Sequence, residues 1–338
     1  MKRSKALLVL AFSTLTSFMP FISMISPVSV HAQRISAAER VMEVDSRRIL
    51  YQEHGDIRLP MASTTKIATA ISVLDSGIDI EATVSIPHNA VGVEGSSVYL
   101  KEGEEYSVKD LLYGLMLRSG NDCAVALAET VDGSVGAFST RMNETAQRAG
   151  ALDTHFVNPH GLPAKLHYTT AVDLSLITSY AMQNPLFCSI VSTKYYQPRA
   201  WQNKNKMLVQ YEGAIGVKTG YTKEAGKCLV SAAEREGMRL VVTVLNCPTA
   251  YERSKTLFDD AFSKYTRKRL LGATEVLRFD GGEGVPGQDY YYPLMEGEEE
   301  HIEIVAKPFV CSENKKIVGQ FEIYLLKQLL FCGNLYKL

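Results

Sequence analysis

Three short polar motifs, far apart in the chain, constrain its fold most, because they can act together only if folding brings them to one place. In chain order they are Ser63-Thr64-Thr65-Lys66, Ser119-Gly120-Asn121 and Lys218-Thr219-Gly220. Ser63 and Lys66 stand at the start of a predicted helix, three residues apart and on one face, so the amine can reach the hydroxyl. Because a serine hydroxyl is a poor nucleophile until a base takes its proton, this pair predicts a nucleophile and its base.

Lys66 can act as a base only when its neutral form is accessible. Burial and a second nearby cation both lower the pKa of a lysine, and Lys218 is the candidate for that cation. Each motif alone occurs by chance in many chains, whereas the three motifs in this order are a specific signal. No histidine is required for such a site.

The motif set resembles that of the penicillin-recognising serine enzymes, which comprise the penicillin-binding proteins and the serine β-lactamases. Residues 154–162, 168–174 and 215–222 are similar to the serine-type D-alanyl-D-alanine carboxypeptidases (peptidase S11 type) among the low-molecular-mass penicillin-binding proteins. The resemblance covers about residues 34–272. It implies an α+β fold, in which a penicillin-binding/serine β-lactamase-like domain, an antiparallel sheet flanked by a helical region, is followed by a small all-β domain.

The resemblance implies a catalytic role for three residues. Ser63 would attack the carbonyl between the two terminal D-alanines of a peptidoglycan stem peptide and form an acyl-enzyme that water then hydrolyses. Lys66 would be the general base for that attack, and Ser119 would relay a proton toward the leaving amine. β-Lactam antibiotics mimic the D-Ala-D-Ala terminus, so penicillin would acylate Ser63 as a covalent inhibitor. No cofactor is implied.

The same resemblance implies a substrate-binding role for five further residues. Asn121 would hydrogen-bond the substrate backbone, while Lys218 and Thr219 would hold the free terminal carboxylate. The backbone N–H of Tyr221 would form the oxyanion hole together with that of the nucleophile. Gly220 would leave room for the substrate along its strand because it has no side chain.

Two other functions stay open from the sequence. A serine β-lactamase-like hydrolase would share the acylation step, but class A enzymes carry S-D-N and a downstream E-x-x-L-N loop, and both are absent here. A catalytically inactive, wall-binding scaffold protein is the second alternative, although all three motifs are retained. His155, His160 and His167 lack metal-site spacing and are interpreted as bracing a loop near the cleft, so no metal is predicted.

The first 32 residues have the pattern of a secretory signal peptide. Lys2, Arg3 and Lys5 precede an apolar stretch that runs to about residue 25, and residues 30–32 form a small-residue cleavage pattern. We therefore expect an exported, extracytoplasmic protein, in the cell wall or periplasmic space or secreted. The apolar stretch could also just span a bilayer, so a membrane tether through an uncleaved segment stays open, as does a peripheral membrane association.

The composition excludes several classes of protein. With 338 residues, 22 % charged and 46 % hydrophobic, the chain can bury a large core and is neither disordered nor fibrous. Its formal charge of −1 offers no basic face, so nucleic acid is not expected as a partner. The six cysteines form no C-x-x-C pair and are expected to be buried free thiols, with Cys311 and Cys332 as the pair to check for a disulfide.

The pattern along the chain predicts a signal peptide at 1–32, a catalytic domain at 33–272 and a small β domain at 273–338. Helices are predicted at 64–75, 108–117, 122–131, 135–149, 171–182 and 251–265. Hairpins are predicted at 37–50 and 226–245, and the basic residues 264–269 are interpreted as a linker. Residues 320–338 are predicted to form the last hairpin, although the apolar run 323–332 leaves a short helix open. Tyr290, Tyr291 and Tyr292 are interpreted as part of a sheet face, with contact to a wall polymer or membrane as the alternative.

Overall fold

The computed structural model describes residues 37–308 and 316–338. The predicted signal peptide lies outside the described residues, and so does Cys311 of the proposed cysteine pair. Within the part of the chain that is described, no helix is long and apolar enough to cross a membrane.

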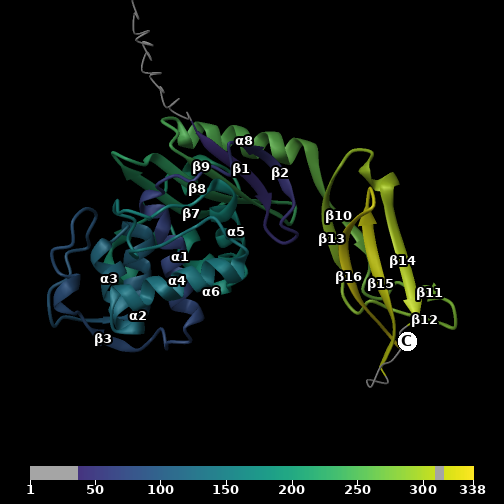
Figure 1. The fold of residues 1–338 in the computed structure, drawn as a ribbon, viewed down its shortest axis with the longest axis horizontal. Coiled ribbons are helices and arrows are strands. Elements are labelled where there is room, and N and C mark those ends of the chain that lie inside the picture. Colours follow the sequence, from purple (N-terminus) through teal and green to yellow (C-terminus); the bar gives the residue numbers. More distant parts are fainter. Residues whose placement is uncertain (1–36, 309–315) are drawn as a thin grey trace, which may run out of the picture. The chain divides into compact units, whose positions relative to one another are not determined.

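A five-stranded antiparallel sheet forms the centre of the fold, in the order β2-β1-β9-β8-β7 (Figure 1). The strands are β1 (Ala38–Glu43), β2 (Ile49–Glu53), β7 (Ala214–Thr222), β8 (Gly226–Arg235) and β9 (Met238–Leu245). The two predicted hairpins are therefore confirmed as β1–β2 and β8–β9. The first hairpin pairs with β9, so the beginning and the end of this region meet in one sheet.

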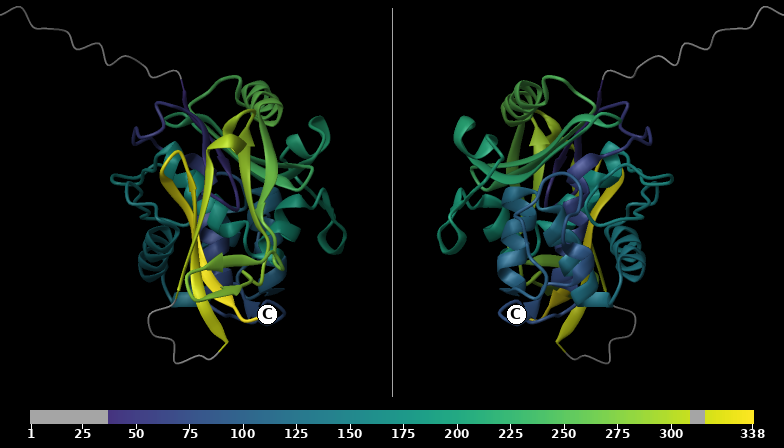
Figure 2. Two further views of the ribbon diagram at one scale, coloured as in Figure 1. Left: turned by 90° about the vertical axis from the view of Figure 1, so that its right-hand side faces the viewer. Right: turned by 90° about the vertical axis from the view of Figure 1, so that its left-hand side faces the viewer.

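Both faces of the sheet are covered, because alternate residues of its central strands point to opposite sides. Val242 and Val244 pack with Phe258 of helix α8 (Ala250–Lys264) in one apolar cluster. Val241 and Leu245 pack in a second, larger cluster with most of the remaining helices. Figures 1 and 2 show α8 on one side of the sheet and the helical region on the other.

The helical region confirms most of the predicted helices. It contains α1 (Lys66–Asp75), α2 (Val108–Tyr113), α3 (Asn121–Asp132), α4 (Val135–Ala149), α5 (Ala171–Ala181), α6 (Pro185–Ser192) and α7 (Met207–Gln210). Ser134 and Thr170 cap α4 and α5, since each side chain accepts a hydrogen bond from the third residue of its helix. A short 3-10 turn, η1 (Ala62–Thr65), leads into α1, and a π-helical turn, η3 (Gly114–Arg118), follows α2.

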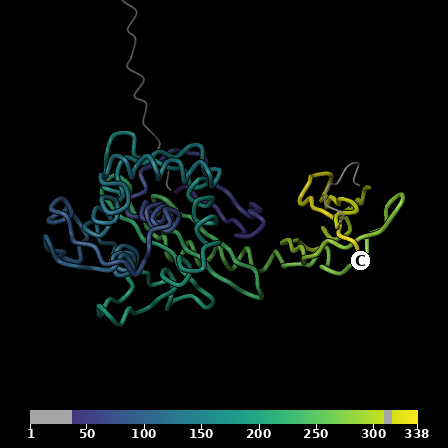
Figure 3. Tube along the Cα trace, turned by 90° about the horizontal axis from the view of Figure 1, so that it is seen from below, coloured from purple at the N-terminus to yellow at the C-terminus, as the bar shows by residue number. Residues whose placement is uncertain are grey.

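The C-terminal region is all-β, as predicted. Strands β14 (Ile302–Pro308), β15 (Ile317–Leu325) and β16 (Gln328–Tyr336) form an antiparallel sheet, so the last segment is a hairpin and not a helix. Figure 3 follows this part of the chain in the green and yellow that end its colour bar. Smaller pairs are β11 (Leu277–Phe279) with β12 (Gly282–Gly284), β3 (Thr83–Ser85) with β4 (Glu105–Ser107), and β5 (Tyr195–Tyr196) with β6 (Trp201–Gln202).

The interpretation of residues 264–269 as a linker is wrong. Strand β10 (Tyr265–Leu271) pairs with β13 (Tyr290–Met295). Its basic side chains make contacts within the paired strands and beside them: Arg267 stacks over the ring of Tyr291, and Lys268 forms an ion pair with Glu299. A run of charged residues therefore marks an exposed strand here, and the exact domain boundary near residue 272 stays a prediction.

The tyrosines of β13 contribute to a sheet face, as interpreted from the sequence. Tyr290 makes edge-to-face contacts with Phe321 and Phe331, and Tyr292 is buried. Such aromatic pairs stabilise a small core.

Candidate active site

The first motif places a lysine amine beside a serine hydroxyl. Ser63 lies in the turn η1, Lys66 begins α1, and the Lys66 Nζ lies 3.1 Å from the Ser63 Oγ. Nζ also lies 2.6 Å from the Oδ1 of Asn121 and 2.6 Å from the carbonyl oxygen of His160. A neutral amine has two N–H groups for these two close acceptors, which leaves its lone pair directed toward the hydroxyl of Ser63.

Burial keeps this amine poised to lose its proton. Lys66 is fully buried, and desolvation, followed by the charge of Lys218, lowers its pKa well below the usual value. Both effects disfavour the charged form. The sequence predicted this perturbation and its second cause.

The second motif meets the first at the start of α3. Ser119 adopts a left-handed conformation after the π-helical turn, with φ of 63°, and Asn121 is the first residue of the helix. Asn121 joins the amine to a neighbouring loop, because its Nδ2 donates to the carbonyl of Glu94 at 2.5 Å. The hydroxyl of Ser119 has no hydrogen-bond partner among the described residues, so it remains available to another group.

The third motif lies on the edge strand β7, against the turn that carries Ser63. A Cβ on Gly220 would lie 3.0 Å from the carbonyl oxygen of Met61 and 3.1 Å from the amide nitrogen of Ser63. Glycine at this position therefore allows the strand to approach the turn that carries Ser63 closely. The next residue, Tyr221, has an exposed side chain.

Lys218 is a second buried amine on the same strand. Its Nζ donates to the carbonyl of Thr219 at 3.0 Å. Burial, followed by the charge of Lys204, lowers its pKa to about 7. The structure thus brings all three motifs together, as their order in the sequence predicted.

Two charged residues near the site were not predicted. Asp122 is buried, and its carboxylate accepts hydrogen bonds from the Ser97 hydroxyl at 2.5 Å and from the amides of Val98 and Leu100. Lys204 donates to the hydroxyl of Ser96 at 3.3 Å. Both therefore hold the loop that Asn121 also contacts. The signal for Asp122 was present in the sequence as the single acidic residue at the start of an otherwise apolar helix.

The loop that contains the histidines packs against the turn that carries Ser63 and against the start of α1. The Thr69 hydroxyl donates to the carbonyl of Pro159 at 2.6 Å, in addition to the contact between Lys66 and His160. Gly161 has a φ of +89°, and a Cβ there would lie 1.9 Å from the carbonyl oxygen of Ala62. Only glycine fits this conformation and this contact.

Histidine side chains brace the same loop, as predicted. The Nδ1 of His167 accepts from the amide of Val157 at 3.1 Å, so its Nε2 carries the proton that faces the Thr65 hydroxyl at 2.9 Å. Burial lowers the pKa of His167 to about 4 and that of His160 to about 3, so both rings are neutral. No group of metal-ligating side chains was found among residues 37–308 and 316–338.

The cysteines that the structure describes are free thiols, and Cys123, Cys228 and Cys247 are buried. Cys123 lies in the core of α3, where burial raises the pKa of its thiol well above the usual value. The expectation of buried free thiols is confirmed for these three cysteines and is wrong for Cys188, which is half-buried, and for Cys332. Cys332 is an exposed free thiol.

Comparisons with known proteins agree with the motifs. The sequence profile of the D-alanyl-D-alanine carboxypeptidases, peptidase S11, matches residues 26–249. The chain is 33 % identical over 251 residues to D-alanyl-D-alanine carboxypeptidase DacF of Bacillus subtilis, covering 70 % of this chain and 64 % of DacF. It is 36 % identical over 237 residues to DacB2 of Mycobacterium tuberculosis, covering 66 % of this chain and 81 % of DacB2.

A solved structure extends the similarity to the C-terminal region. Penicillin-binding protein 5 from Haemophilus influenzae superposes with a TM-score of 0.76 at 26 % identity, covering 90 % of this chain and 96 % of that protein. The α+β fold with a C-terminal all-β region is thereby confirmed. On the sequence profile and the DacB2 match together, the chain belongs to the D-alanyl-D-alanine carboxypeptidase family, peptidase S11.

Proposed function

We propose that this protein is a serine-type D-alanyl-D-alanine carboxypeptidase that removes the terminal D-alanine from peptidoglycan stem peptides and thereby limits cross-linking. The observation that carries the proposal is the buried Lys66 amine, 3.1 Å from the Ser63 hydroxyl and repelled by a second buried lysine. The family membership and the names of the relatives support the same activity.

The acylation step follows from the contacts of Lys66. Its neutral amine takes the proton of Ser63 while the serine oxygen attacks the penultimate D-alanine carbonyl. The Asn121 and His160 oxygens hold the amine in place and stabilise the ammonium as it forms. The amides of Ser63 and Tyr221 form the oxyanion hole, which the close approach of Gly220 to the Ser63 nitrogen supports.

The departure of D-alanine requires a proton on its amine. The Ser119 hydroxyl, which has no partner among the described residues, relays that proton from the Lys66 ammonium. Lys218 and Thr219 hold the carboxylate of the departing residue, and Asn121 has one further N–H for the substrate backbone. Water then hydrolyses the acyl ester and restores Ser63.

Two properties accompany this activity. β-Lactams acylate Ser63 covalently because their strained amide occupies the position of the scissile bond. The substrate exists outside the cytoplasmic membrane, so the protein is exported, and residues 1–32 serve as its signal. Fractionation of cells into membrane and soluble material tests whether the protein is tethered to the membrane or associates with it peripherally.

The activity has a direct assay. Purified protein incubated with diacetyl-Lys-D-Ala-D-Ala should release one equivalent of free D-alanine, while the same peptide ending in L-Ala-L-Ala should release none. Free alanine of either configuration is measured by chromatography of the released amino acid. Equal release from both peptides would indicate a non-specific peptidase and contradict the proposal.

The pKa of Lys218 predicts a fall in activity at alkaline pH. Its pKa of about 7 means that the ammonium is present below pH 7 and is lost as the pH rises through that value. Because a neutral amine cannot hold the substrate carboxylate, kcat/KM should fall above about pH 7, mainly through KM. Lys66 must be neutral to act as the base, and burial, followed by the charge of Lys218, lowers its pKa well below the usual value, which favours that neutral form.

The control for this pH profile is Lys218→Arg. A guanidinium stays protonated throughout the range, so the falling limb should move upward by more than one pH unit. A falling limb that stays in place in this variant would assign it to another group.

A further inference from the structure

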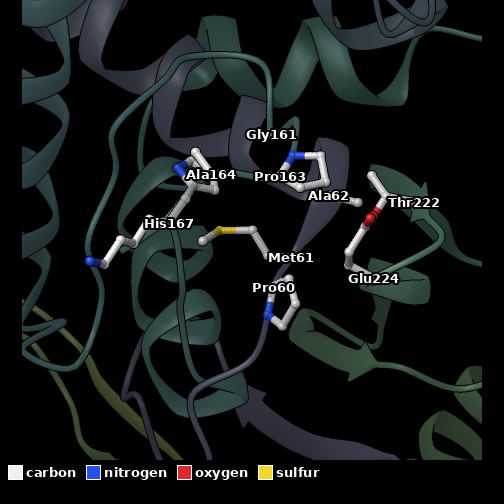
Figure 4. A pocket seen from close by; sticks show the side chains of 10 residues that line it. Pro60, Met61, Ala62, Gly161, Pro163, Ala164, His167, Thr222 and Glu224 are labelled. Carbon is white, nitrogen blue, oxygen red and sulfur yellow. The ribbon is translucent and has the colours of Figure 1, made fainter.

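A pocket with a volume of about 390 Å³ lies beside the residues that lead into Ser63 (Figure 4). Met61 and Ala62, which directly precede Ser63, line one part of it, and Thr222 at the end of β7 lines another. Pro163 also lines it. Neither Lys218 nor Thr219 lines it, so the pocket is distinct from the place that these two residues give to the substrate carboxylate.

The proposed function, on which this inference rests, fixes the direction of the bound peptide. The terminal carboxylate lies at Lys218 and Thr219, and the scissile carbonyl lies at the amide of Tyr221. A peptide that follows these two points runs along β7 and advances about 3.3 Å per residue. The residue before the two D-alanines must therefore pass Thr222, at the mouth of the pocket.

The pocket combines an apolar centre with two opposite charges. Met61 and Ala62 are buried, whereas Lys165 and Glu224 are exposed lining residues. Neither charge forms an ion pair with any other described residue. Figure 4 shows Glu224 on the opposite side of the pocket from Ala164. Both charges therefore line the same pocket as the apolar centre.

We propose that this pocket binds the side chain of the stem residue that precedes the two D-alanines. It favours a side chain that ends in both an amino group and a carboxylate, as in meso-diaminopimelate. The aliphatic part packs on Met61 and Pro163, the amino group pairs with Glu224, and the carboxylate pairs with Lys165. A lysine side chain engages Glu224 alone.

Three tripeptides separate these contacts. They are acetyl-X-D-Ala-D-Ala with X as meso-diaminopimelate, lysine or the uncharged norleucine, and kcat/KM is measured for each from D-alanine release. Because an exposed ion pair is weak, each pair should contribute about two- to fivefold in kcat/KM. The wild-type order should be diaminopimelate, then lysine, then norleucine, and the differences should shrink in 1 M salt.

Two variants test which pocket residue binds the amino group of the peptide side chain and which binds its carboxylate. Glu224→Gln should lower kcat/KM, relative to the norleucine peptide, for both the diaminopimelate and the lysine peptide. Lys165→Gln should lower this ratio for the diaminopimelate peptide alone. The matched control is Glu236→Gln, an exposed glutamate in the turn at the far end of β8, which should leave these ratios unchanged.

The outcomes are distinguishable. Equal kcat/KM for all three peptides, or variants that leave the ratios at their wild-type values, would overturn the pocket assignment while leaving the carboxypeptidase intact. The absence of D-alanine release from every peptide would overturn the proposed function and, with it, this inference.

Discussion

Replacement of Lys66 by arginine should reduce the rate at which penicillin acylates Ser63 by about 10²- to 10⁴-fold, the usual contribution of a general base. Arginine places a permanent positive charge where the lysine amine is neutral, and it can donate to the same acceptors, Asn121 and His160. It cannot lose its proton at any accessible pH, so it cannot take the proton of Ser63. Acylation is measured as single-turnover labelling by a fluorescent penicillin.

Lys66→Met is the companion variant, because it removes the base without adding a charge and keeps an unbranched side chain. We expect a loss of the same size as in Lys66→Arg. If Lys66→Arg retained acylation within tenfold of the wild-type rate while Lys66→Met did not, the positive charge would be what matters, and the role of Lys66 as a base would be wrong. Circular dichroism verifies that both variants are folded.

Replacement of Gly161 by alanine should disturb both stability and activity. A Cβ at this position would lie 1.9 Å from the carbonyl oxygen of Ala62, so the loop and the turn that carries Ser63 must separate. We expect a loss of about 2–5 kcal/mol in the free energy of unfolding, from backbone strain and overpacking together. Displacement of the nucleophile by about 1 Å should also lower kcat/KM roughly 10²-fold.

Gly150→Ala is a close control for this effect. Gly150 has the same φ of +89°, but a Cβ there would meet no atom within 4 Å. It should cost about 1–2 kcal/mol through the left-handed conformation alone and leave kcat/KM unchanged. Urea unfolding and D-alanine release measure both quantities. If the two variants behaved alike, the contact between Gly161 and Ala62 would have no role in positioning Ser63.

The local parts of the site could be predicted from the sequence. Ser63 and Lys66 share one helical turn, and the 3.1 Å distance between their side-chain atoms follows from residue spacing. The low pKa of Lys66 could be expected from its burial and from Lys218 as the candidate second cation, although these two residues lie far apart in the chain and only the fold brings them together.

The parts that involve backbone groups or long-range packing could not be predicted. The carbonyl of His160, which accepts from Lys66, carries no signal in the residue type, because every residue has a carbonyl. The basic residues within 264–269 favour a linker when the sequence is considered alone. Only the pairing of β10 with β13 shows that most of this segment forms a strand. The role of Asp122 depends on a loop more than twenty residues earlier in the chain.

The most direct test of the account is the location of the bond that penicillin forms. Intact wild-type protein treated with benzylpenicillin should gain the mass of one antibiotic molecule, and peptide mapping should place it on Ser63. Ser63→Ala should gain no mass and release no D-alanine. An adduct on another residue, or D-alanine release by Ser63→Ala, would contradict the assignment of Ser63 as the nucleophile and of the three motifs as one active site.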